Sequence, residues 1–401
     1  AMQEGNSGSS LPWNYYRDSI TKVVVESGIT TICSYAFDEC PNLTSVTIPY
    51  GVTKIGNWAF WGCSALPSIT LPYTLTETGQ GAFGKCSSLT YITIPDNVTE
   101  MGGDDFSGCT SLTGVTLSSN LTSIYRNMFS GCTSLKNVTI PSGITYIAYG
   151  AFRNCAALTE ITLPTGVTHI LDSAFAGCTS LTSVTIPRNV ISMGENPFEG
   201  CTKLTGIYVN AYNTAFTHDG YGVLYNADKT KLIAAPGALS GSYTIPDSVT
   251  EIGAYAFSGC SKLTSVTVGS GVDTIIYGAF ENCTSLKTVR FKGNVPGDFR
   301  TSAFTGVTAT VYYPEGNSSW SSAQQNYGGT LTWVAEAGTV GGTSADGLRW
   351  TLADGVLTIS GSGNMMDYEW REEPWYYYYP VITRIVIESG VKSIGESAFY
   401  Q

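Results

Sequence analysis

The eleven cysteines are the residues of this 401-residue chain with the greatest capacity for chemistry, as nucleophiles, metal ligands or disulfide partners. Ten of them share one column of a repeat, and the first eight recur at a constant step of 23 residues: Cys40, Cys63, Cys86, Cys109, Cys132, Cys155, Cys178 and Cys201, followed after an interruption by Cys260 and Cys283. The sequence has no close C-x-x-C pair of the kind that metal sites use. We therefore expect stacked, buried thiols that act as small apolar residues, and no metal site.

Other signals of chemistry are weak. The sequence Gly79-Gln-Gly-Ala-Phe-Gly84 has the G-x-G-x-x-G spacing of a dinucleotide site, but no long helix follows to receive a pyrophosphate. The only two histidines, His169 and His218, lie far apart in the sequence, and the carboxylates are scattered. A nucleophile with an adjacent base is therefore not expected. We predict no catalytic residue, no cofactor and no enzymatic activity.

The elements that position these residues are copies of one repeat, best seen in residues 151–170. Leu158, Ile161 and Leu163 alternate there with polar residues, which predicts a half-buried strand, and Pro164 ends the strand because it has no N–H to donate. A tight helical turn around Phe175 leads to the next strand. A single repeat cannot bury its apolar residues, so the coils must stack about 4.8 Å apart. The fold class is therefore a repeat solenoid with a parallel β-sheet on one face, mostly strand and turn.

Composition limits the class of partner. The chain has 31 acidic and 20 basic residues, a net charge of −11, which disfavours nucleic acid and anionic membranes as partners because both require clustered basic charge. The sequence has no run of eighteen apolar residues, so we expect no membrane insertion. Residues 1–10 lack the pattern of a signal peptide, which fits either a cytoplasmic chain or a mature chain from which a signal was removed.

Breaks in the period predict the domain organisation. The expected parts are an N-terminal capping coil at 1–37, a solenoid at 38–310 with an enlarged coil at 207–245, a C-terminal cap at 311–337, a flexible linker at 338–347, and a hairpin with the first coil of a second, truncated array at 348–401. The second array is indicated because residues 373–399 align with residues 11–37 at a constant offset of 362.

The consensus A-F-x-x-C-x-x-L-x-x-V-T-I-P-x-x-V-T-x-I-G resembles the BspA-like leucine-rich repeat family of bacterial secreted and surface proteins. This resemblance covers residues 20–310 densely. It implies a right-handed solenoid of 23-residue coils and a role in attachment to host proteins, other cells or glycans, and it implies no catalytic residues. It also implies a secreted or cell-surface location.

The outward positions of the strand face are the expected binding surface. Threonine fills most of one outward column and predicts a ladder, which is either a structural device or, in an alternative function, a surface for carbohydrate or another ordered lattice. Residues of types that suit protein recognition lie in this column, in the other outward column or just after the strands. The candidate binding residues are Tyr50, Tyr73, Tyr91, Glu160, Tyr208 and Arg290. The main functional hypothesis is adhesion to a protein ligand or glycan, and a second alternative is a structural spacer that displays other domains.

Residues 348–401 carry a further hypothesis. Their single coil has apolar residues that need a neighbouring coil. We expect this segment either to associate with an array end of a second molecule or to fold back on the chain's own cap.

Overall fold

The computed structural model describes residues 12–336, 340–353, 355–369 and 371–399. Most of the predicted N-terminal capping coil is described, but its residues 1–11 fall outside these ranges. Residue 337 of the predicted C-terminal cap and residues 338–339 of the predicted linker also fall outside them. The chain divides into two compact units. Unit 1 comprises residues 1–227 and 233–238, and unit 2 comprises residues 228–232 and 239–401.

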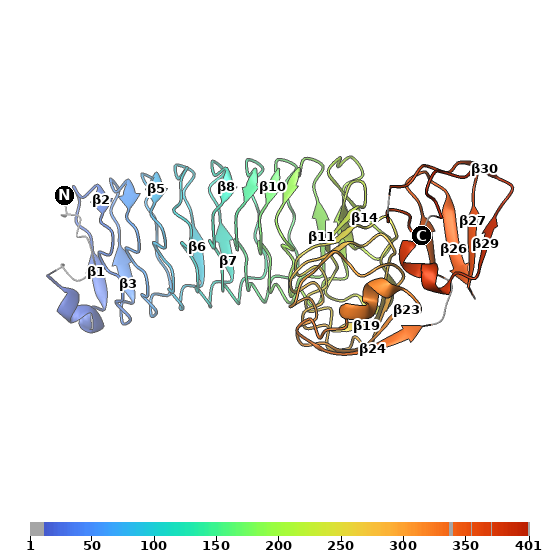
Figure 1. Cartoon of the computed structure of the whole chain (residues 1–401). Helices are drawn as coiled ribbons and strands as arrows, with labels where there is room; N and C mark the ends of the chain where they lie inside the picture. Colours follow the sequence, from blue (N-terminus) through green and yellow to red (C-terminus); the bar gives the residue numbers. More distant parts are fainter. Residues whose placement is uncertain (1–11, 337–339, 354, 370, 400–401) are drawn as a thin grey trace. The chain divides into compact units, whose positions relative to one another are not determined.

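Unit 1 begins with a short 3-10 helix, η2 (Asn14–Ser19), and continues as a stack of coils (Figure 1). One face of the stack carries parallel strands at the predicted positions: β1 (Lys22–Val24), β3 (Ser45–Thr47), β6 (Tyr91–Thr93), β7 (Gly114–Thr116), β11 (Ser183–Ile186) and β13 (Gly206–Val209). Equivalent residues of successive repeats pair, as Val23 does with Val46 and Val184 with Ile207. The 23-residue period of the sequence is therefore the register of the sheet.

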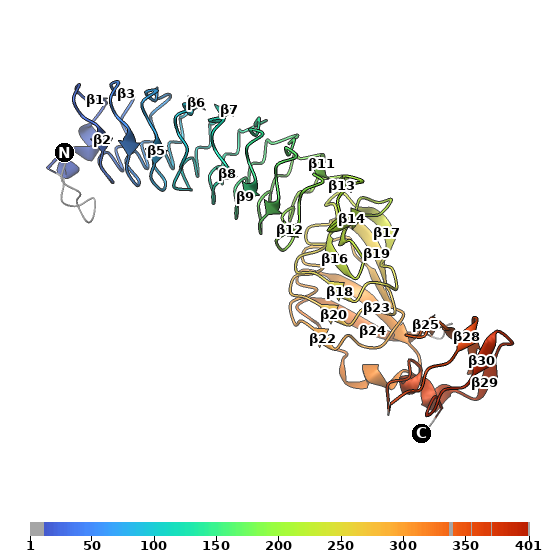
Figure 2. The same ribbon diagram turned by 90° about the horizontal axis from the view of Figure 1, so that it is seen from above.

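A second face of unit 1 carries its own parallel ladder (Figure 2). These strands have two residues each: β2 (Thr31–Ile32), β4 (Lys54–Ile55), β5 (Glu77–Thr78), β8 (Ser123–Ile124), β9 (Tyr146–Ile147), β10 (His169–Ile170) and β12 (Ser192–Met193). The inward residue of each pair fills the core, as Ile55 and Ile147 do. The sequence predicts this extended segment, and the structure shows that it also pairs between coils.

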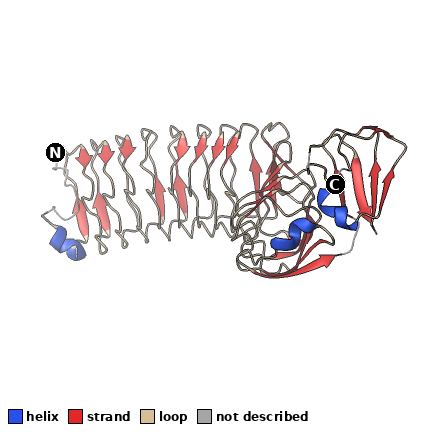
Figure 3. Ribbon diagram, viewed as in Figure 1, coloured by secondary structure: helices blue, strands red, loops and turns tan. Residues whose placement is uncertain are grey.

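The core of unit 1 is one continuous column of apolar side chains. Phenylalanines of successive coils stack face to face, with ring centroids 5.9 Å apart for Phe60 and Phe83 and 5.3 Å apart for Phe152 and Phe175. The turns close with hydrogen bonds between residues that are three apart in the sequence, such as the bond from the Cys63 N–H to the Phe60 carbonyl. Figure 3 shows turns and short strands through these coils, and helix only at η2, η3 and η4 among the described residues.

Cysteine has a specific place in each coil. Eight of the ten thiols in the column donate to the phenylalanine carbonyl of the preceding coil, as Cys63 does to Phe37 at 3.2 Å and Cys132 does to Phe106 at 3.1 Å. All eleven cysteines lie in the described part of the chain, are buried and form no disulfide there. The expectation of buried thiols is confirmed.

The enlarged coil interrupts this pattern. In unit 1 it contributes β14 (Phe216–His218) and β15 (Leu224–Asn226), which pair antiparallel. Strand β16 (Lys231–Ala234) follows, and its Lys231 and Leu232 pair in parallel with β18 (Glu251–Ile252) of unit 2.

Unit 2 resumes the stack. One face has five parallel strands in the order β17 (Ser240–Thr244), β19 (Lys262–Val268), β21 (Thr288–Phe291), β23 (Thr308–Pro314) and β24 (Thr330–Glu336), and the other face continues from β18 to β20 (Thr274–Ile275) and β22 (Asp298–Phe299). The 3-10 helix η3 (Ser318–Ser322) places Trp320, which is fully buried, against Phe291. Aromatic residues thus cover the last coil.

The C-terminal segment forms a small sheet in the order β25 (Val340–Thr343), β26 (Arg349–Ala353), β27 (Val356–Ser360) and β29 (Arg384–Ile387). It also contains β28 (Gly363–Asn364) paired with β30 (Val391–Ser393), and the 3-10 helix η4 (Tyr376–Val381). Strands β26 and β27 form the predicted antiparallel hairpin. The range 338–347, predicted to be a flexible linker, instead contains β25, because Gly341 and Gly342 add a strand to the edge of β26.

This segment packs on the chain's own cap, which is the second of the two arrangements expected for it. The Ser318 hydroxyl donates to the Tyr377 carbonyl at 3.5 Å. Val381 fills the space next to Gly316, where a Cβ would lie 2.3 Å from its Cγ1. Association with a second molecule remains a hypothesis.

Candidate functional site

Two of the candidate binding residues, Tyr73 and Tyr91, line one groove on the strand face of unit 1. Its volume is about 510 Å³, and its walls are Ser68, Ile69, Thr70, Leu71, Tyr73, Thr90, Tyr91, Ile92, Thr93 and Pro95. No lining side chain is charged. We call this the Tyr91 groove.

The groove exists because one coil does not join the sheet. Residues 68–71 align with β3 and β6 but are not a strand. In the neighbouring coils a threonine before the strand donates its N–H to the preceding coil, as Thr44 does to Thr21 at 2.9 Å and Thr113 does to Thr90 at 2.9 Å. Pro67 takes this place and has no N–H to donate. The inward Ile69 stays buried, with 7% exposure, as Val115 of strand β7 does with 8%.

Tyr91 lies flat on the sheet rather than projecting from it. Its ring covers Gly114 of the next strand, where a Cβ would come within 3.3 Å of Cδ2 and Cε2. Its hydroxyl forms a hydrogen bond with the Thr116 hydroxyl. The ring remains 50% exposed. Tyr91 is therefore an aromatic platform held by two residues of one neighbouring strand.

Tyr73 and Tyr50 occupy the same column, just after the strand position. Both are open to solvent, at 63% and 77% exposure. The backbone at Tyr73 is fixed because its carbonyl accepts from Asn97 Nδ2 at 2.9 Å. Tyr73 borders the Tyr91 groove, whereas Tyr50 does not line it.

Glu160 lies in a second groove, of about 350 Å³, lined by Asn137, Val138, Thr139, Ile140, Glu160, Thr162 and Pro164. Its walls are residues 137–140 and 160–164, which also lack strand structure. The predicted threonine column is exposed along unit 1, but the sheet beneath it is interrupted here and at residues 68–71. A flat lattice-binding surface is disfavoured by these interruptions.

Tyr208 is separate from both grooves. Its ring leans over Gly206 of its own strand, where a Cβ would lie 2.7 Å from Cζ, and it meets the edge of His218 at a centroid distance of 5.6 Å. The enlarged coil thus supports Tyr208 through His218, whose Nδ1 accepts from the Val209 N–H at 3.1 Å.

Arg290, in unit 2, is already engaged. Its guanidinium forms two hydrogen bonds with the Glu336 carboxylate, one of them 2.9 Å long, and lies 5.0 Å from the centre of the Tyr312 ring. The hydrogen bond from Arg290 lowers the pKa of Glu336 and raises that of Arg290. This arrangement suits a structural pair between strands better than an anchor for a partner.

Within the described ranges, no group of three or more His, Cys, Asp or Glu residues is placed to hold a metal ion. No helix in those ranges has the length and apolar character to cross a membrane. The sequence interpretation missed the roles of Pro67, Gly114 and Thr116, although proline in a threonine column and glycine in an outward column were visible signals.

Comparison with known proteins gives consistent results. A family model described as BspA type leucine rich repeat region matches in six copies, over residues 13–132, 101–221 and 239–317. A leucine-rich repeat protein from Bacteroides ovatus is 26% identical, with a TM-score of 0.55 over 79% of this chain and 84% of that chain. A leucine rich cell surface protein from Faecalibacterium prausnitzii is 25% identical, with a TM-score of 0.54 over 79% and 88%. No curated protein matched significantly.

Proposed function

Because this chain belongs to the BspA-type leucine-rich repeat family, we propose that it is a non-enzymatic adhesion module of a bacterial surface or secreted protein. In this proposal the strand face of unit 1 binds a protein on a host or neighbouring cell, with Tyr91 as the central contact. The similarity to a Faecalibacterium leucine rich cell surface protein supports the location.

The observation that carries the proposal is the fixed orientation of the Tyr91 side chain. A flexible exposed tyrosine loses rotamer freedom when it binds, and that loss reduces affinity. Tyr91 is already fixed by Gly114 and Thr116, while half of its surface stays open. Large, rigid aromatic side chains of this kind are typical energetic centres of protein interfaces.

The groove beside Tyr91 adds a complementary recess. Its apolar floor is Ile69, Leu71 and Ile92, and its rim carries serine and threonine hydroxyls. An apolar centre with a polar rim is the usual composition of a protein interface. Because the lining is uncharged, we expect binding at this face to depend only weakly on salt.

The test is binding of the full chain to immobilised extracellular-matrix proteins and to cell-wall glycans, measured by surface plasmon resonance. The variants are Tyr91→Ala and Tyr73→Ala, and the matched control is Tyr212→Ala, since Tyr212 is 80% exposed but lies outside the groove. We expect a protein ligand whose affinity falls at least about 30-fold in Tyr91→Ala, as for an interface hot spot, and is unchanged in Tyr212→Ala.

Two results would contradict the proposal. If both groove variants keep the affinity of the wild type for every ligand found, the strand face near Tyr91 is not the binding surface. If the chain binds nothing in either panel, the spacer hypothesis is favoured, in which the coils only display other domains.

A further inference from the structure

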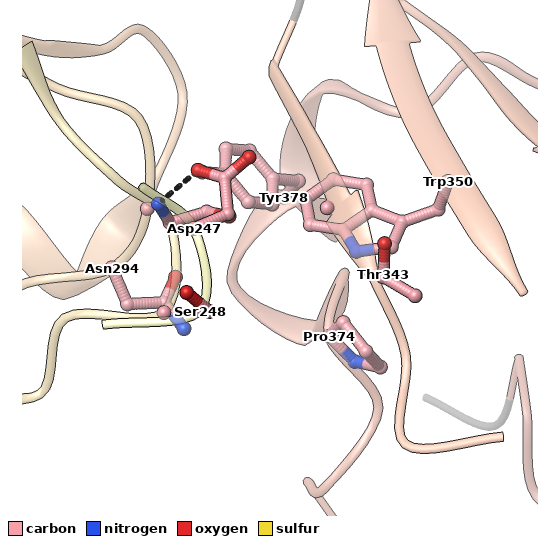
Figure 4. A pocket seen from close by; sticks show the side chains of 11 residues that line it. Asp247, Ser248, Asn294, Thr343, Trp350, Pro374 and Tyr378 are labelled. Carbon is pink, nitrogen blue, oxygen red and sulfur yellow. Dashed lines mark hydrogen bonds between the residues drawn. The ribbon is translucent and has the colours of Figure 1, made fainter. Parts of the chain in front are cut away.

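Unit 2 contains a second cavity, unrelated to the strand face, which we call the Trp350 pocket. One wall consists of turns that follow the strands of the array and the other belongs to the C-terminal segment (Figure 4). Its volume is about 380 Å³, and its lining is Asp247, Ser248, Ser270, Gly271, Gly293, Asn294, Gly342, Thr343, Trp350, Pro374 and Tyr378. This volume lies at the low end of the range for small-molecule sites, about 300–1,000 Å³.

The pocket contains a polar group that the protein does not fully satisfy. Tyr378 is 1% exposed, and its buried hydroxyl has the Asn317 side chain as a polar neighbour but forms no hydrogen bond of good geometry. Burial raises the pKa of this hydroxyl to about 12, so it remains a donor at neutral pH. The Trp350 side chain, which is 5% exposed, lines the same space and carries an indole N–H. Buried polar groups are normally paired, so the Tyr378 hydroxyl indicates a missing acceptor in this wall.

The opposite wall is polar, and its one carboxylate already has partners within the protein. The Asp247 carboxylate accepts from the Ser270 N–H at 2.9 Å and lies 3.9 Å from Lys292 Nζ. Asn294 Oδ1 accepts from Asn317 Nδ2 at 2.9 Å, which leaves the Asn294 amide N–H groups available. The Ser270 and Thr343 hydroxyls also border the space.

A glycine keeps the pocket open. A Cβ on Gly342 would lie 3.1 Å from Trp350 Nε1 and 3.4 Å from the Ser270 hydroxyl. Gly342 is therefore the point at which the two walls come closest. A side chain added there would occupy the space in front of the indole N–H.

The chemical groups that line the pocket indicate which class of ligand it can bind. The lining has no cationic side chain, which disfavours phosphates and carboxylates, and its single carboxylate is already engaged, which disfavours a cation. Hydroxyl, amide and indole N–H groups beside aromatic carbon match a compact molecule that has both many hydroxyls and apolar C–H edges. We propose that the Trp350 pocket binds a neutral sugar unit, the end residue of a glycan or a free monosaccharide.

The experiment is isothermal titration of the full chain with glucose, galactose, mannose and N-acetylglucosamine, and with glucuronic acid as the acidic comparison. The variants are Trp350→Phe, Tyr378→Phe and Gly342→Val. Tyr378→Phe removes only the hydroxyl, Trp350→Phe removes the N–H together with the five-membered ring that carries it, and Gly342→Val fills the space. Tyr212→Ala serves as the matched control, because Tyr212 is 80% exposed and lines neither this pocket nor the Tyr91 groove.

We expect saturable binding of at least one neutral sugar, weakened roughly 3- to 10-fold in Trp350→Phe and Tyr378→Phe, abolished in Gly342→Val and unchanged in Tyr212→Ala. Thermal unfolding of each variant separates loss of binding from loss of fold, and Tyr378→Phe should fold at least as well as the wild type because it removes an unpaired buried hydroxyl. The proposal is overturned if no neutral sugar binds, if only glucuronic acid binds, or if Trp350→Phe and Gly342→Val bind as the wild type does.

Discussion

Trp13 and Trp375, which are 362 residues apart in the sequence, make the same pair of contacts with the coils that follow them. Trp13 Nε1 donates to the Ala36 carbonyl at 2.7 Å, and Trp375 Nε1 donates to the Ala398 carbonyl at 2.8 Å. Each ring also stacks on the phenylalanine that follows, at centroid distances of 6.1 Å and 5.6 Å. The sequence offset between the arrays thus corresponds to one repeated structural device for starting a stack.

The first prediction concerns this device. Trp375→Phe keeps an aromatic ring but removes the indole donor, which leaves the Ala398 carbonyl with only the longer hydrogen bond from the Tyr379 hydroxyl, at 3.3 Å. We expect a loss of about 1–2 kcal/mol in the free energy of unfolding, measured by urea denaturation. Tyr15→Phe is the control, because Tyr15 is 95% exposed. Equal stability of Trp375→Phe and the wild type would show that the hydrogen bond does not hold the coil.

The second prediction concerns pH. Asp105 is completely buried, which raises the pKa of its carboxyl to about 8, and the nearby Thr78 hydroxyl offsets this only in part. The unfolded carboxyl titrates near pH 3.9, so the native state retains a proton that the unfolded state releases. The contribution of Asp105 to stability therefore falls as the pH rises from about 4 to about 8 and is constant above that range.

Asp105→Ala should reverse this effect, since other coils carry alanine there, such as Ala82 and Ala151. We expect the variant to be more stable than the wild type by on the order of 3 kcal/mol at pH 8.5, with the difference largely lost at pH 4. Urea unfolding at both pH values measures it. Glu160→Ala, which removes an exposed carboxylate, is the control for the change in net charge. A difference that is the same at both pH values would exclude titration of Asp105 as the cause.

How far the sequence predicts the structure depends on the range of the interaction. The burial of the cysteine column could be predicted from spacing alone, because most coils repeat the same contact. The contact between Thr78 and Asp105 could not be predicted in this way, since each residue appears in the sequence as an isolated departure from the repeat. Their proximity depends on how adjacent coils are stacked. Likewise Tyr91 was predicted to be exposed, but its flat posture depends on Gly114 in the next coil.

The third prediction tests the cause of the Tyr91 groove. Pro67→Thr restores an N–H that can donate to the preceding coil, as Thr44 and Thr113 do. We expect residues 68–71 to join the sheet, with a gain of roughly 0.5–1.5 kcal/mol in stability and loss of ligand binding at the groove. Amide hydrogen exchange of residues 68–71 measures the first effect directly. Unchanged exchange would mean that proline does not cause the interruption.

The fourth prediction concerns the thiols. Burial raises the pKa of Cys40 to about 11 and that of Cys109 to about 12, so neither is a thiolate at pH 8. We expect a disulfide reagent such as DTNB to modify the folded chain only as fast as it unfolds, and all eleven cysteines to react at once in denaturant. Fast reaction of several thiols in native buffer, with the circular dichroism spectrum unchanged, would contradict this.

The hydrogen bonds between coils of unit 1 give the chain a mechanical character. Bonds such as Thr44 N–H to the Thr21 carbonyl and Phe60 N–H to the Ala82 carbonyl connect each coil only to its neighbours. A tensile force that separates the coils acts on these hydrogen bonds one layer at a time. Each coil that opens releases 23 residues, or about 75 Å of extended chain, while the remaining layers stay closed. A stack of this kind yields to tension by stepwise lengthening, which limits the force on the layers that stay closed.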